Sequence, residues 1–154
     1  MLTRLRHWAI GLAALVLVLS PRRRALWQAM RAFVRDLPKA LEAPLPQALA
    51  TLTPTFPDLV VPNTTLRLLA DAAALFERRS PFGLCLRRSL VRYHFLRRVG
   101  IPLTLNFGAR FKSGQPDQEV TGHAWVTLNG QPYFEEGENY QGFTVMFQYP
   151  GGSA

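Results

Sequence analysis

The stretch "LCLRRSLVRYHFLRRVG", Leu84–Gly100, predicts a helix at the centre of the fold. It follows the helix-breaking residues Pro81 and Gly83, and it ends at a glycine, a residue that favours helix C-termini. Its apolar residues cover more than one narrow stripe, so we expect the helix to be packed on several sides. Cys85 lies in its first turn.

Helical patterns precede this stretch. Apolar residues at helical spacing predict a helix over Arg23–Leu37, and the prolines that follow limit it, leaving short helical pieces through Leu52. After a proline-punctuated connector, Asn63 or Thr64 can cap a helix of good helix formers that runs to Arg79.

Beyond Gly100 the pattern changes to the alternation of strands. The segment "LTLNFGARF", residues 103–111, places alternate apolar side chains on one face, and residues 120–128, 131–136 and 143–149 continue in the same style. The sequence therefore predicts an α+β fold, in which N-terminal helices precede a cysteine-bearing helix packed on an antiparallel sheet of about four strands.

Composition limits the classes of protein to which the chain can belong. With 154 residues and 48% apolar side chains, one compact domain is expected. A single cysteine excludes an internal disulfide and a cysteine-built zinc site, and it favours a reducing compartment. We expect a cytoplasmic protein without a metal or other cofactor.

The basic character lies at the N-terminus. The net charge is +8, and the first 40 residues hold eight Lys and Arg against one acid. The apolar run Trp8–Leu19 would rise only about 18 Å as a helix, short of a hydrocarbon core of about 30 Å. Pro21 and the arginines after it give no signal-peptide cleavage site. We expect residues 1–62 to form a basic, apolar helical region, and residues 63–154 to form the core of the fold.

Two roles are open for that N-terminal region. A helix buried against the core is the first, and a helix docked beside the core on a partner or on the inner face of a membrane is the second. Nucleic acid is not an expected partner, because the arginines are not interleaved with aromatic residues in a reading motif.

Three residue types point to catalysis. A cysteine at a helix N-terminus is stabilised as thiolate by the helix dipole and unpaired N–H groups. The segment "GHAWVTLNGQPYFEE", Gly122–Glu136, adds His123, which can deprotonate the thiol, and two glutamates that can orient the imidazole. Taken singly, a free cysteine is most often a buried hydrophobe and adjacent glutamates are a solvated turn. Their order along the chain favours a catalytic set.

Hairpin register decides which glutamate faces His123. A two-residue Asn129-Gly130 turn pairs Leu128 with Gln131 and sets Glu136 opposite His123, whereas a three-residue loop sets Glu135 there. Asn-Gly suits either turn, so the turn residues leave both glutamates open.

The blocks "CLRRSLVRYHFLRRVGIPLTLNFGARF" and "GHAWVTLNGQPYFEE" resemble the transglutaminase-like cysteine peptidases of lasso-peptide biosynthesis. The resemblance is specific from Thr64 to Tyr149 and general before it. It implies a papain-related fold that removes the leader from a ribosomally made precursor peptide. It also implies two partner proteins, a separate leader-recognition domain and an ATP-using macrolactam cyclase.

Carried over to this chain, the resemblance makes Cys85 the nucleophile and His123 the general base and acid. The third residue departs from the aspartate of the family. Glu135 lies at the family's spacing from the histidine, and Glu136 is the alternative acid. No glutamine shortly precedes Cys85, so the Cys85 N–H is the oxyanion donor we nominate. A catalytically silent scaffold with the same fold, recruiting a precursor or a membrane partner, is the alternative function.

Overall fold

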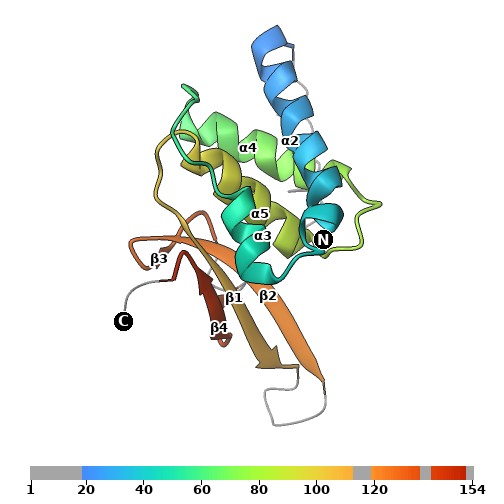
Figure 1. The fold of residues 1–154 in the computed structure, drawn as a ribbon, viewed down its shortest axis with the longest axis vertical. Coiled ribbons are helices and arrows are strands. Elements are labelled where there is room, and N and C mark those ends of the chain that lie inside the picture. The colour runs from blue at the N-terminus through green and yellow to red at the C-terminus, as the bar shows by residue number, and fades with distance from the viewer. Residues whose placement is uncertain (1–18, 113–118, 136–139, 152–154) are drawn as a thin grey trace.

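A computed structural model describes residues 19–112, 119–135 and 140–151, which form helices followed by a sheet (Figure 1). The helices of this described part are α2 (Pro21–Ala40), α3 (Leu45–Leu52), α4 (Asn63–Phe76) and α5 (Leu84–Arg97). The strands are β1 (Thr104–Phe111), β2 (Val120–Leu128), β3 (Gln131–Pro132) and β4 (Thr144–Tyr149). The predicted α+β class with an antiparallel sheet is confirmed.

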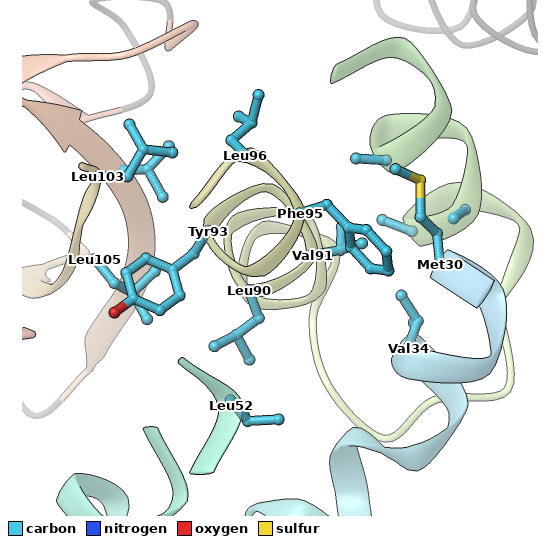
Figure 2. Close-up of a cluster of buried hydrophobic side chains, with 14 of the residues drawn as sticks. Met30, Val34, Leu52, Leu90, Val91, Tyr93, Phe95, Leu96, Leu103 and Leu105 are labelled. Atoms are coloured by element: carbon cyan, nitrogen blue, oxygen red, sulfur yellow. The ribbon is translucent and has the colours of Figure 1, made fainter. Parts of the chain in front are cut away.

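Helix α5 lies at the centre of the packing, as its sequence predicted. Its apolar side chains point outward in several directions and meet both the other helices and the sheet (Figure 2). Tyr93 and Leu96 have no exposed surface, and Phe95 has 2%. Because the helix is enclosed, it can hold polar side chains in fixed positions as well: Arg87, Ser89 and Arg92 are all buried.

The N-terminal helices share this core. Met30 and Val34 of α2 and Leu52 of α3 belong to the same hydrophobic cluster as the side chains of α5 (Figure 2). Among the described residues, no helix is long and apolar enough to cross a membrane. Residues 8–18 of the apolar run lie outside the described residues.

Several helix boundaries differ from the sequence prediction. The N-cap of α4 is Pro62, and the predicted cap Asn63 is the first residue of the helix. Helix α2 continues past Pro38 to Ala40, because a proline in the last turn removes only one hydrogen bond and Leu37 beside it is fully buried. Helix α4 ends at Phe76, before the predicted Arg79, because Glu77 is bound elsewhere. Its carboxylate accepts from Arg31 of α2 at 2.7 Å, and its carbonyl accepts from the Arg87 guanidinium of α5.

The sheet has the order β3-β2-β1-β4, with β1 and β2 at its centre. Leu105 pairs with Val126, and both are fully buried in the hydrophobic cluster beside α5. Side chains of successive residues point to opposite faces of a strand. Gly108 and its partner His123 therefore lie on the face opposite to that of Leu105 and Val126.

Strand β3 is shorter than predicted. Asn129 and Gly130 both have positive φ, and Leu128 pairs with Gln131, which is a two-residue hairpin turn. The strand ends at Pro132, and Phe134 has φ of 56°, a left-handed conformation that leaves the ladder. The Phe134 carbonyl accepts from Arg92 of α5 at 3.1 Å, so the chain after β3 turns toward that helix.

Candidate active site

Cys85 is the second residue of α5 and carries a free, half-buried thiol. The helix begins after its N-cap residue, Gly83, which has no side chain to accept a hydrogen bond from the first N–H groups. A Cβ atom added to Gly83 would lie 3.8 Å from the Cys85 Sγ, so the thiol lies against the start of the helix. The first N–H groups of a helix have no intrahelical partners and can stabilise negative charge there.

A side chain that sequence reasoning did not single out ties this helix to the histidine strand. The Ser89 hydroxyl donates to the Ala124 carbonyl at 2.7 Å in the buried interior. Ser89 lies one turn after Cys85, and Ala124 directly follows His123. The serine's spacing of four residues from the cysteine was the available signal, since such residues share a helix face.

The early end of β3 makes room for this bond. The Val126 carbonyl accepts from the Tyr133 N–H, which continues the hairpin for one residue beyond β3. Alternate carbonyls of a strand point to the same side, and the next one on this edge, that of Ala124, accepts from Ser89. Helix α5 thus takes the place beside β2 that a longer β3 would fill.

His123 lies half-buried in an aromatic cluster on the other face of β2. Its ring stacks on Trp125, with centroids 5.8 Å apart, and lies 5.3 Å from the Phe143 ring. Its Nε2 atom is buried and has no hydrogen-bond partner among the described residues, so it makes no bond to the Cys85 thiol in this arrangement. Catalytic hydrogen bonds often tighten only when substrate binds.

The surroundings of His123 favour its neutral imidazole over the charged form. Burial lowers its pKa from the ordinary value, and the positive charges of Arg88 and Arg110 lower it further. A neutral imidazole has one unprotonated ring nitrogen, which is what a general base requires.

Gly108 is a second residue that the sequence analysis did not identify. It pairs with His123, and a Cβ atom at this position would lie 2.8 Å from the Trp125 ring and 3.0 Å from the Thr144 carbonyl. Only glycine lets the tryptophan ring pack this closely. A glycine inside a strand is the signal that could have indicated the close approach.

Glu135 is bound by arginines of α5. Its side chain is completely buried, and its two carboxylate oxygens accept from Arg88 and Arg92, each at 3.0 Å. Arg92 also donates to both oxygens of Asp71 on α4, at 2.6 and 2.8 Å. The structure therefore places Glu135 on the guanidinium groups and not on the Nε2 atom of His123.

The hairpin register does not choose the acid. The turn has two residues, the alternative in which continued pairing would set Glu136 opposite His123, but β3 ends at Pro132, before either glutamate. Glu136 lies outside the described residues. In the part of the chain that the structure covers, no group of three or more His, Cys, Asp and Glu side chains is arranged to hold a metal ion.

Comparison with protein families agrees with this architecture. A family model described as the transglutaminase-like superfamily matches residues 15–148. The chain belongs to this superfamily, which includes cysteine peptidases and transglutaminases. No curated protein and no solved structure matches the chain.

Proposed function

We propose that this protein is a cysteine peptidase that removes the leader from a ribosomally synthesised precursor during lasso-peptide maturation. The observation that carries the catalytic part is the Ser89–Ala124 hydrogen bond, because it joins the helix turn after Cys85 to the residue after His123. The narrower role rests on the resemblance of the two sequence blocks to the leader peptidases. A leader-recognition protein and a macrolactam cyclase are its proposed partners, in the cytoplasm.

The proposed reaction has two steps. His123 takes the thiol proton, and the Cys85 sulfur attacks the scissile carbonyl while the Cys85 N–H stabilises the oxyanion. The C–N bond breaks, and the imidazolium gives the proton to the leaving amine of the core peptide. Water, deprotonated by His123, then attacks the thioester, and the leader leaves with a new carboxylate.

Glu135 completes the proposed set. The resemblance assigns it the role of orienting the imidazole. An indirect effect through Arg88 is supported by two observations, because the guanidinium that binds Glu135 also lowers the pKa of His123. Glu136 is the alternative acid.

A catalytically silent scaffold that recruits a precursor or a membrane partner is the second candidate. The observation that favours it is the binding of the Glu135 carboxylate by two arginines, with the Nε2 atom of His123 unbonded among the described residues. A scaffold needs no reactive thiol, so reactivity separates the two functions.

Thiol labelling tests the proposal directly, because Cys85 is the chain's single cysteine. We expect iodoacetamide to alkylate the folded protein rapidly near neutral pH and His123→Ala to slow this reaction. Equal, slow alkylation of both proteins would support the scaffold.

Precursor cleavage is the second measurement. The substrate to be tested is a precursor peptide whose leader is followed by a Gly-first core segment with a downstream Asp or Glu. The wild-type protein should release its leader, with the recognition protein added, and Cys85→Ala should not, although its thermal unfolding stays close to wild type. Retained cleavage by pure Cys85→Ala protein would falsify the mechanism.

A further inference from the structure

The positive charges of two arginines, Arg88 and Arg110, lower the pKa of His123. The two differ in whether a carboxylate balances their charge. Arg88 donates to the buried Glu135 carboxylate at 3.0 Å, so its charge is balanced inside the protein. Arg110 of β1 is exposed and has no carboxylate partner among the described residues. The charge of Arg88 is used within the structure, whereas the charge of Arg110, which no carboxylate balances in the part of the chain that the structure covers, is available to a ligand.

The structure holds Arg110 in a defined place. Its guanidinium carbon lies 4.4 Å from the centroid of the Phe143 ring, and its Nη1 donates to the Gln141 carbonyl at 3.4 Å. The Phe143 ring in turn lies 5.3 Å from the His123 ring. The arginine is therefore stacked on the same aromatic side chain that packs against the imidazole.

Register places the two residues on one face of the sheet. Gly108 pairs with His123, and Arg110 follows Gly108 by two residues, so its side chain leaves the same face of β1. A peptide whose scissile carbonyl lies beside His123 would have a neighbouring side chain within reach of this guanidinium.

The charge at this position needs an explanation. A cation beside a general base lowers the imidazole pKa, and the stacking on Phe143 satisfies only the flat face of the guanidinium. Its N–H groups match the geometry of a carboxylate, which they bind through two parallel hydrogen bonds. A carboxylate from the substrate would both fill this site and offset the charge.

We propose that Arg110 is a specificity residue that binds an Asp or Glu side chain of the substrate peptide close to the scissile bond. The inference rests on the proposed peptidase function and names its substrate class, peptides with an acidic residue near the cleaved bond. Arg110 does not take part in bond making. It selects and positions the peptide beside His123.

Matched peptide sets test this proposal. A synthetic peptide library, in which each position near the scissile bond carries Glu, Gln or Lys, is digested and the products are quantified by mass spectrometry. We expect the wild-type protein to cleave one Glu series at least about tenfold faster than its Gln series in kcat/KM, because a charge-assisted hydrogen bond is lost. Cleavage that Cys85→Ala abolishes is the only cleavage counted.

Three variants separate recognition from packing. Arg110→Gln should cleave the Glu and Gln peptides at the same rate as each other, which removes the wild-type preference, and Arg110→Glu should prefer Lys. Lys112→Gln is the matched control, since Lys112 is exposed on the same end of β1 and already paired with Glu119 at 2.7 Å. It should keep the wild-type preference.

Each outcome decides a different claim. If no library peptide is cleaved in a Cys85-dependent way, with the recognition protein present, the peptidase function fails. If cleavage occurs but the wild-type protein treats Glu and Gln alike, only the role of Arg110 is overturned. An equal loss of rate by Arg110→Gln on both peptides would also overturn it, because Arg110 would then only support Phe143.

Discussion

The polar groups on the two sides of strand β2 differ in whether they have partners. On the α5 side, the side chains Asp71, Arg92, Glu135 and Arg88 form a continuous network of ion pairs. On the aromatic side, His123 has a buried ring nitrogen with no hydrogen-bond partner among the described residues, and Arg110 has no carboxylate partner among them.

This difference distinguishes the polar groups that stabilise the fold from those that we propose take part in the reaction. Charges buried in a protein interior are costly unless paired, and the Asp71–Arg92–Glu135 group meets that condition with hydrogen bonds of 2.6 to 3.0 Å. An unpaired ring nitrogen in an otherwise packed cluster has no stabilising role. Its hydrogen-bonding capacity is unused among the described residues, as the proposed role of His123 as general base requires.

The largest effect is expected from His123→Ala, which removes the imidazole from the aromatic side of β2. Without a general base the thiol loses its route to the thiolate, so precursor turnover should fall by about a thousandfold or more. Iodoacetamide labelling of Cys85 should slow as well. Unchanged labelling together with unchanged turnover would show that His123 does not activate the thiol.

Arg92→Met tests the ion-pair network on the α5 side of β2. It leaves the Asp71 and Glu135 carboxylates without their shared partner, so the free energy of unfolding should fall by about 3 to 5 kcal/mol. Lys112→Met is the control, since Lys112 and Glu119 form a pair with side chains 68% and 70% exposed, and it should cost at most about 1 kcal/mol. Urea unfolding measures both. Equal losses would mean that burial does not distinguish the two ion pairs.

Much of the fold could be predicted because hydrophobic periodicity determines it. Apolar residues on several faces of α5 indicated a central helix, and the alternation in β1 placed Leu105 and Phe107 together on the face that packs against the core. The end of β3 could not be predicted in the same way. "QPYFEE" has strand-like alternation, but contacts of Phe134 and Glu135 with arginines of a helix more than forty residues earlier remove them from the ladder.

The candidate site was predictable only in part for the same reason. Cys85 and His123 carry signals of their own, a helix start and a strand position. The roles of Ser89 and Glu135 depend on partners distant in sequence, Ala124 for the serine and two arginines for the glutamate. Local patterns do not specify such pairings.

Glu135→Gln tests the carboxylate that binds Arg88, the arginine that also lowers the pKa of His123. The amide cannot balance two guanidinium groups, so the free energy of unfolding should fall by about 1 to 3 kcal/mol, and turnover should fall strongly because Arg88 loses its anchor. Glu136→Gln should change turnover little. Precursor cleavage by the folded fraction of each variant gives the ranking, and the reverse order would transfer the acidic role to Glu136.

The smallest effect is the dependence of stability on pH. Burial lowers the pKa of His94 and of His123, and the charges of Arg88 and Arg110 lower that of His123 further. Below the ordinary histidine pKa of about 6.5, the unfolded chain therefore binds more protons than the native protein. Stability should be complete above that pH and should fall as the pH drops toward the lowered native pKa values.

Urea midpoints at about pH 7.5 and about pH 5.5 measure this change, since they bracket the ordinary histidine pKa of about 6.5. We expect the wild-type midpoint to fall between the two conditions, and the midpoint of His123→Gln to fall less, because one of the two buried imidazoles no longer titrates. His94 continues to contribute in that variant. Its Nδ1 lies 2.7 Å from the Leu52 carbonyl, a bond that favours the protonated ring and opposes the effect of burial. A wild-type midpoint that rises as the pH falls would contradict the burial of both rings as the cause.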